Sequence, residues 1–174
     1  MDKVELMIDK YTGELFIDSA SVGIGPRFTR KDFVSSIVSS ESRMLVKNEP
    51  YCSFSVGSHE ISGLRFMVSL SFYGDILESI ELTHDDEEPI SSSSDWSEEK
   101  ELKRKRIHDQ WLTSLQGRTS HRYSWGEIWS GYDPRSDGSS ITIRYSWQGK
   151  PWNPPLRKSL TERLWELIFR REKQ

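Results

Sequence analysis

The sequence predicts an α+β fold: an antiparallel β-meander, a central helix, a second, tryptophan-rich β-hairpin and a C-terminal helix. Apolar and polar residues alternate over much of 51–82, which is the period of half-buried strands in an antiparallel sheet. Two later segments instead repeat apolar residues every three or four positions and begin with a capping residue, as amphipathic helices do. With 174 residues and 20.3 kDa the chain has the size of one domain, so we assign residues 1–174 to a single domain.

The first elements are expected to be short. Residues 4–8 and 14–17 are rich in apolar side chains and flank residues 11–13, which predicts an opening hairpin. Thr29 followed by Asp32 is typical of a helix start. The apolar stripe of this helix consists of Phe33, Ile37 and Val38.

The meander is predicted from alternation. Residues 51–56 and 64–72 are expected to be strands, and Gly74-Asp75 fits a two-residue hairpin turn because glycine accepts positive φ at the first central position. Its buried face is expected to carry the following residues: Cys52, Phe54, Val56, Leu64, Phe66, Val68, Leu70, Phe72, Ile76, Ile80 and Leu82.

Residues 84–94 lose all periodicity and contain four acids, a proline and four consecutive serines. This composition predicts a solvated loop and a possible junction between two subdomains. Asp95 with Glu98 resembles a capping box, so a helix is expected from there to about Leu115, ending before Gly117. Its apolar stripe consists of Trp96, Ile107, Trp111, Leu112 and Leu115.

The second hairpin is expected to pair residues 123–132 with residues 139–147. In the returning strand, alternation separates an apolar face from a polar one that carries Thr142, Arg144 and Ser146. A last helix is expected to begin at Ser159. Its stripe consists of Leu160, Leu164, Leu167 and Ile168.

Composition narrows the class of protein. The 7 Trp, 6 Tyr and 7 Phe are too many for a disordered chain, although charged residues make up 29% of it. No apolar run is long enough to span a membrane and no secretory signal is visible, which indicates a cytoplasmic protein. The single cysteine, Cys52, excludes an intrachain disulfide and a multi-cysteine zinc site, and neither a metal nor another cofactor is expected.

Charge is unevenly spread along the chain. Residues 1–95 carry a formal charge of −9 and residues 96–174 carry +6, within a total of −3. The acidic maximum is at Asp85, Asp86, Glu87 and Glu88, and the basic maximum is at residues 103–106. The basic run near Trp111 is compatible with nucleic-acid binding, but a pI of 5.9 argues against it.

Few residues form a pattern that indicates catalysis. The sequence contains no phosphate-binding glycine loop, no nucleophile elbow and no paired zinc histidines. Glu101, Arg104 and His108 share one face of the central helix, where they would either tune a general acid or base or form a satisfied polar patch. A hydrolase that uses Glu101 and His108 is therefore one alternative function.

Several short strings give a resemblance to a class of proteins. They are residues 11–14 (YTGE), 94–101 (SDWSEEKE) with 108–112 (HDQWL), and 132–136 (YDPRS) with 140–145 (SITIRY). With these strings the chain resembles small bacterial cytosolic proteins, many of which are immunity proteins of polymorphic-toxin or contact-dependent growth inhibition systems. The resemblance implies a role, which is to bind a cognate toxin and block its active site, but no catalytic residues.

The resemblance leads to a hypothesis about the contact surface. If the toxin has a basic cleft, Asp85, Asp86, Glu87 and Glu88 are the expected contacts, with Trp96 as an aromatic anchor. The alternative outside the enzymes is an adaptor or structural protein that belongs to no toxin system.

Overall fold

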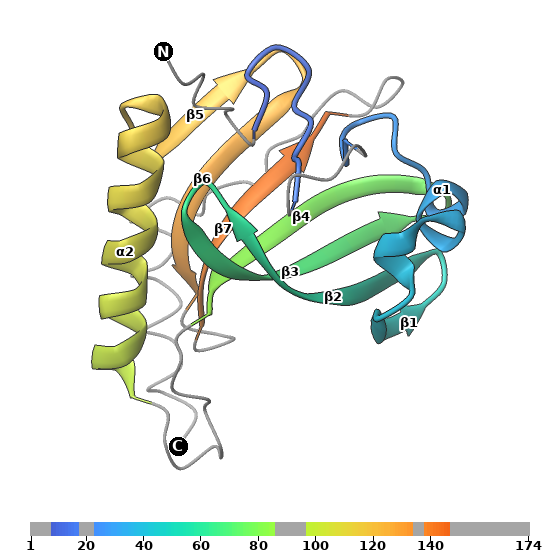
Figure 1. The fold of residues 1–174 in the computed structure, drawn as a ribbon, viewed down its shortest axis with the longest axis horizontal. Helices are drawn as coiled ribbons and strands as arrows, with labels where there is room; N and C mark the ends of the chain where they lie inside the picture. The colour runs from blue at the N-terminus through green and yellow to red at the C-terminus, as the bar shows by residue number, and fades with distance from the viewer. Residues whose placement is uncertain (1–7, 18–22, 86–96, 134–137, 147–174) are drawn as a thin grey trace, which may run out of the picture.

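The computed structural model describes residues 8–17, 23–85, 97–133 and 138–146. Its elements in chain order are α1 (Arg30–Ser35), the 3-10 helix η1 (Ile37–Ser39), β1 (Arg43–Asn48), β2 (Tyr51–Ile61), β3 (Leu64–Tyr73), β4 (Ile76–His84), α2 (Glu98–Gln116), β5 (Ser120–Tyr123), β6 (Gly126–Asp133) and β7 (Gly138–Tyr145). The fold is α+β, as predicted (Figure 1).

The strands of the described residues form one antiparallel sheet in the order β1-β2-β3-β4-β7-β6-β5. The meander β1–β4 joins the second group of strands through β4 and β7, where residues 79–82 pair with residues 141–144. Both strand-rich regions therefore belong to a single sheet, although residues 86–96 and α2 lie between them in the sequence. The predicted junction at 84–94 falls mostly outside the described residues.

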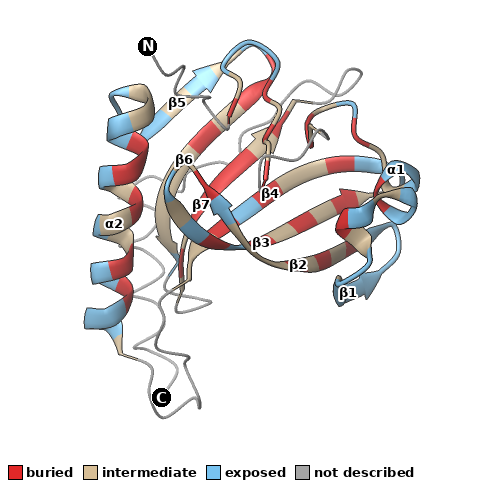
Figure 2. Cartoon of the chain, viewed as in Figure 1, coloured by how far each residue is buried: buried red, intermediate tan, exposed pale blue. Residues whose placement is uncertain are grey.

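One face of the sheet is apolar and carries the core (Figure 2). Helix α1 packs there through Phe33, whose ring centroid lies 4.9 Å from that of Phe54. Helix α2 packs there through Trp111, 4.8 Å from Phe66. The N-terminal segment covers a third part, because the Tyr145 hydroxyl on β7 donates to the Gly13 carbonyl at 2.9 Å. Each described α-helix therefore lies on this face.

The opposite face of the sheet is polar. Two rows of cross-strand neighbours cross all seven strands on this face, and they follow from the strand register. The first row is Val46, Ser53, Ser71, Ser79, Arg144, Glu127 and Arg122. The second row is Arg43, Ser55, Ser69, Glu81, Thr142, Trp129 and Ser120. Hydroxyls dominate the β2–β4 part, and charged and aromatic side chains dominate the β5–β7 part.

Most predicted elements are confirmed. Thr29 caps α1 in a capping box with Asp32, and these hydrogen bonds lower the pKa of the Asp32 carboxyl. The Gly74-Asp75 turn is present with Gly74 at φ 59°. At the N-terminus, Ile8 bridges Leu15 as the opening hairpin requires. The C-terminal helix predicted from Ser159, the residue Trp147 and the start of the first predicted strand lie outside the described residues.

Helix α2 begins later than predicted. Its N-cap is Ser97, whose Oγ accepts a hydrogen bond from the Lys100 N–H at 3.2 Å, so the cap is not Asp95. Asp95 and Trp96 lie outside the described residues. The helix ends as predicted, with Gly117 in the left-handed conformation at φ 77°.

Two predictions about individual residues in the first half are wrong, and one strand was missed. Ile76 is exposed and Leu77 is buried, because a β-bulge at Glu78 shifts the register of β4 against β3. Ile37 is 81% exposed because α1 already ends at Ser35 and the chain turns through η1. Strand β1 was not predicted, since all six of its residues are exposed and no alternation marks it.

In the described ranges, no helix combines the length and the apolar character that crossing a bilayer requires.

Candidate functional site

Asp85, the first acid of the predicted contact segment, lies directly after β4 and is half-buried. Its carboxylate accepts a short hydrogen bond from the Ser58 hydroxyl on β2, and its N–H donates to the Arg65 carbonyl at 3.0 Å. Asp85 therefore helps to hold this end of the meander together. Residues 86–88 and Trp96 lie outside the described residues, and their role in binding stays a prediction.

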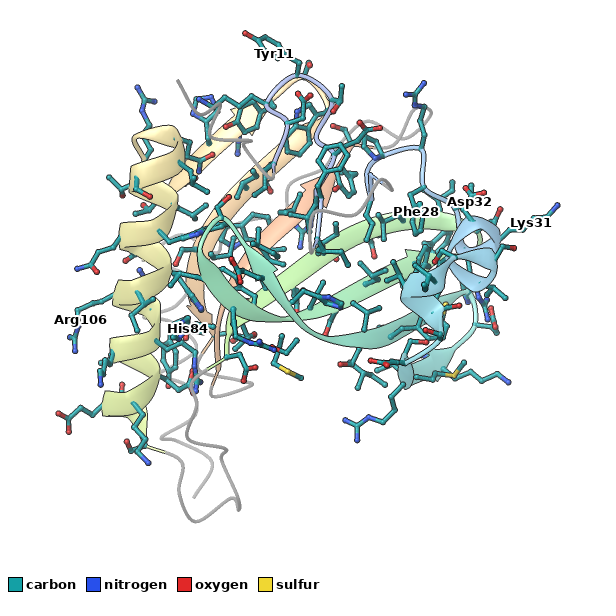
Figure 3. The ribbon with its side chains drawn as sticks, viewed as in Figure 1. Tyr11, Phe28, Lys31, Asp32, His84 and Arg106 are labelled. Carbon is teal, nitrogen blue, oxygen red and sulfur yellow. The ribbon has the colours of Figure 1, made fainter. Side chains whose placement is uncertain are left out.

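The basic run at 103–106 does not form one surface patch. Arg104 is buried, where its guanidinium donates to the Glu101 carboxylate, and Lys105 pairs with Asp109 at 2.6 Å between Nζ and Oδ2. Arg106 points away from the fold into solvent (Figure 3). The helical turn thus spreads the four charges around α2, which weakens the case for nucleic-acid binding at this site.

Glu101 on α2 is buried against the start of β7, and its side chain is 3% exposed. One carboxylate oxygen accepts from Arg104, and the other accepts from the Ser139 N–H at 2.9 Å and the Ser139 hydroxyl at 3.1 Å. Both carboxylate oxygens therefore accept hydrogen bonds from other residues of the protein. Three donors converge on the Glu101 carboxylate here, but the cluster joins the helix to the sheet and offers no free acid or base.

His108 is fully buried and lies about two helical turns beyond Glu101 on α2. Its Nε2 accepts a hydrogen bond from the backbone N–H of His84 at 2.9 Å, and Figure 3 shows His84 beside α2. Burial, followed by the charges of His84 and Arg104, lowers the pKa of His108 to about 4. The imidazole is therefore neutral near pH 7, and Nδ1 must carry its proton, yet Nδ1 has no hydrogen-bond partner among the described residues.

The predicted pair Glu101 and His108 therefore lies on one helix face, as expected, but inside the core. A general acid or base must reach the proton that it transfers, and neither side chain is accessible. Their contacts instead fix α2 on β4 and β7. Cys52 is buried at 2% exposure, and burial raises the pKa of its thiol, which makes it a poor nucleophile.

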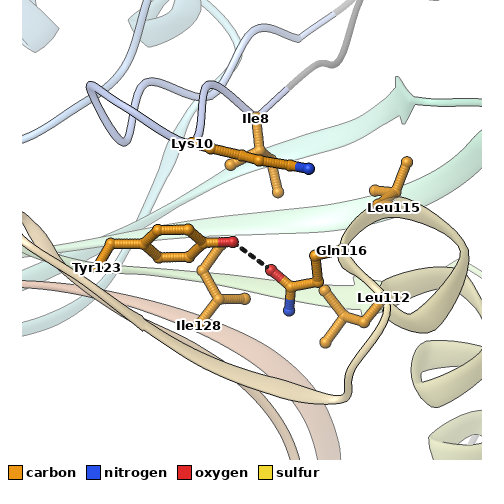
Figure 4. A pocket seen from close by; sticks show the side chains of 7 residues that line it. All are labelled: Ile8, Lys10, Leu112, Leu115, Gln116, Tyr123 and Ile128. Atoms are coloured by element: carbon orange, nitrogen blue, oxygen red, sulfur yellow. Dashed lines mark hydrogen bonds between the residues drawn. The ribbon is translucent and has the colours of Figure 1, made fainter.

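A metal site is not evident in the described part of the chain, where no group of three His, Cys, Asp or Glu side chains is placed to hold an ion. The cavity drawn in Figure 4 lies between α2, β5 and the N-terminal segment, with the Tyr123 hydroxyl donating to Gln116 Oε1 at 2.8 Å. Its volume of about 10 Å³ is the space of roughly one water molecule, so it cannot hold a substrate.

The first candidate surface is the β1 edge, residues 43–48. All six residues are exposed, and the apolar side chains of Met44, Leu45 and Val46 are between 43% and 51% exposed. Strand β1 is the outer strand of the sheet and pairs with β2 alone, so one row of its backbone groups has no partner strand in the described ranges. Figure 1 shows α1 near β1. Val34 in α1 and Ile37 in η1 are also exposed.

A second surface is a groove of about 450 Å³ on the polar face of the sheet, which we call the open-face groove. Its floor is built by β4, β7 and β6, the three strands at the join between the two halves. The polar, charged and aromatic side chains of its lining include Glu81, Thr83, Thr142, Arg144 and Trp129, and Gly131 also lines it. This volume lies in the range of small-molecule sites.

Sequence reasoning missed both surfaces. The exposed β1 edge carries no periodic signal, although the apolar string 44–46 between two basic residues was visible. The groove was visible in part, since alternation placed Thr142 and Arg144 on one face of β7. Glu81 joins them only through the pairing of β4 with β7, which local patterns do not predict.

No protein-family model matches this sequence, and neither a curated protein nor a solved structure matches it.

Proposed function

We propose that this chain is a non-catalytic protein-binding protein of the immunity type, which binds a cognate toxin in the bacterial cytoplasm and neutralises it. The observation that supports the protein-binding part of the proposal is the β1 edge, which has three exposed apolar side chains and an outer row of backbone groups that no described strand pairs with. The immunity part rests on the resemblance of the short sequence strings.

Edge strands support protein binding for a physical reason. Their outer N–H and C=O groups are a template for a further strand, and soluble proteins usually blunt such edges with charges, proline or bulges. Strand β1 has a bulge at Leu45, and Arg43 and Lys47 flank its apolar centre. The exposed apolar surface is nevertheless retained at the centre of the edge, as expected where a partner covers it.

The buried positions of Glu101 and His108 favour binding over catalysis. The hydrolase alternative needs both side chains at a surface, and both are engaged in hydrogen bonds that join α2 to the sheet. The adaptor alternative uses the same exposed edge, so it differs from the immunity proposal only in what the partner does.

The first test is capture of the partner. Purified chain is immobilised and exposed to lysate of its native host at low salt and at about 0.5 M salt, where surface charge pairs are screened. We expect one stoichiometric partner whose toxic activity, measured on the released partner, is silent in the complex. A partner without toxic activity would favour the adaptor, and the absence of any partner would overturn the proposal.

Two matched variants then locate the contact. Leu45→Lys changes the β1 edge, and Leu102→Lys makes the same change on the outer side of α2, where Leu102 is 40% exposed against 44% for Leu45. We expect Leu45→Lys to weaken the complex at least tenfold, and Leu102→Lys to leave it unchanged. If the two variants bind equally well, the β1 edge is not the contact.

The acidic segment is tested separately. Simultaneous reversal of Asp85, Asp86, Glu87 and Glu88 to lysine should weaken binding if the partner presents a basic cleft, and the loss should shrink at high salt. Unchanged affinity would remove this segment from the proposed contact surface.

A further inference from the structure

The open-face groove has a chemistry that the protein-binding proposal does not use. We propose that it binds a small zwitterion of the α-amino acid type, with the carboxylate of the ligand on Arg144 and its ammonium group on Glu81. This inference stands independently of the proposed function, because it concerns different strands and the opposite end of the sheet from the β1 edge.

Arg144 is held in place by a stack of three residues. Its guanidinium lies over the Trp129 ring, 4.9 Å from the centroid. Trp129 in turn lies against Gly131, where a Cβ would be 3.5 Å from Cδ1 and Nε1 of the indole. This is an ordinary van der Waals distance, so Gly131 lies beside the indole, and the indole supports the guanidinium. A guanidinium stacked in this way keeps its N–H edge available, and that edge matches a carboxylate bidentately.

Arg144 forms no ion pair among the described residues. By register Glu127 on β6 lies directly opposite Arg144, but it is paired with Arg122 at 3.5 Å and does not line the groove. Of the carboxylates that line the groove, Glu81 is the one beside Arg144, since Ser79 is opposite Arg144 and Glu81 is opposite Thr142, which makes Glu81 and Arg144 diagonal neighbours on one face. Diagonal neighbours have Cβ atoms within roughly 7–8 Å of each other. No ion pair forms between these two side chains, so two opposite charges stand side by side across the groove floor.

Such a spacing fits a ligand that carries both charges. An α-amino acid places its ammonium and carboxylate on the same carbon atom, so each group reaches one of the two side chains by a charge-assisted hydrogen bond. The hydroxyls of Thr142 and Thr83 line the same floor and add neutral donors and acceptors. The rest of the groove volume remains for the side chain of the ligand.

Charge balance argues against a simple anion. Of the residues that the structure describes, two carboxylates, Glu81 and Asp133, and one guanidinium line the groove, so their summed formal charge is negative. Phosphate or acetate would gain from Arg144 but would be repelled by both carboxylates. A zwitterion adds no net charge and compensates Glu81 as well.

Binding is measured by NMR on the full chain labelled with ¹⁵N. The probes are the standard L-amino acids, each added singly at millimolar concentration, with acetate and methylamine as ligands of one charge. The signals to follow are the indole Nε1–H of Trp129, assigned with Trp129→Phe, and the Nε–H of Arg144. We expect at least one amino acid to shift both signals with saturation, and acetate and methylamine to bind about tenfold more weakly or not at all.

Three variants assign the site. Arg144→Gln and Glu81→Gln each remove one charge, and each should weaken the binding about tenfold or more. Ser69→Ala changes the same polar face outside the groove lining and should leave affinity unchanged. The folded state of each variant is checked by the dispersion of its amide spectrum.

The proposal is overturned if no amino acid shifts the two signals, or if acetate binds as tightly as the best amino acid. It is also overturned if well-folded Arg144→Gln and Glu81→Gln variants bind like the unaltered protein. Because none of these measurements involves the protein partner, failure here leaves the proposed function standing, and failure of the partner capture leaves this inference standing.

Discussion

Acidification from pH 7 to pH 4 is expected to weaken the fold through His108, and the effect can be worked out from its surroundings. The imidazole is buried and neutral, with Nε2 accepting the His84 N–H. Protonation would place a charge in the core and would destroy this acceptor. Burial is the largest cause of the low pKa, and the nearby acids Glu101 and Asp109 only partly oppose it.

The sign and size follow from proton linkage. The pKa of His108 is about 4 in the folded protein and 6.5 in the unfolded chain, so between these values the unfolded state binds more protons. The free energy of unfolding is therefore highest above pH 6.5 and falls as the pH drops towards 4. At about 1.4 kcal/mol for each pKa unit, the loss is about 3 kcal/mol.

Urea denaturation followed by tryptophan fluorescence at several pH values between 7 and 4 measures this loss. The matched variant is His108→Gln, because a glutamine amide oxygen can accept the same hydrogen bond but does not titrate. The variant is expected to be less stable at pH 7, and its deficit relative to the unaltered protein should shrink by about 3 kcal/mol at pH 4. A deficit that stays constant over this range would refute a buried neutral His108.

Three further measurements test packing and burial, two by urea denaturation of variants and one by thiol labelling. Gly13→Ala should cost about 2–4 kcal/mol, because Gly13 has φ 74° and a Cβ there would overlap the Trp125 indole; a loss below 1 kcal/mol would contradict this contact. Tyr145→Phe should cost about 1–3 kcal/mol, since it leaves the buried Gly13 carbonyl without its donor; an unchanged stability would mean that water replaces the hydroxyl. Cys52 should react with a thiol reagent orders of magnitude more slowly in the native protein than in urea, and equal rates would show that it is not buried.

The fold was predictable where burial is one-sided. Strands β2 and β3 follow the alternation of their sequences, and their apolar residues are on the core face, which described helices cover. Strand β1 lacks this signal because neither of its faces is buried. The position of Leu77 was not predictable, because the bulge at Glu78 is a property of two paired strands and not of one.

The candidate sites were predictable only in part. The helical period placed Glu101 and His108 on one face of α2, but whether that face meets solvent or β4 and β7 depends on tertiary packing. The groove depends on the pairing of β4 with β7, which places Glu81 and Arg144 side by side. These two strands are far apart in the sequence, with α2 between them. Local sequence patterns do not predict which distant strands pair.

The seam between β4 and β7 also bears on how the chain folds during synthesis. Strand β4 is complete when residue 84 has been made, but its partner β7 begins at residue 138. At about 5–20 residues per second, the ribosome needs roughly 3–10 s to supply it, and throughout that time the meander has an unpaired inner edge. Residues 1–95, which are made first, carry a charge of −9, so mutual repulsion between nascent chains is expected to hinder their edge-to-edge aggregation until the more basic half arrives and closes the sheet.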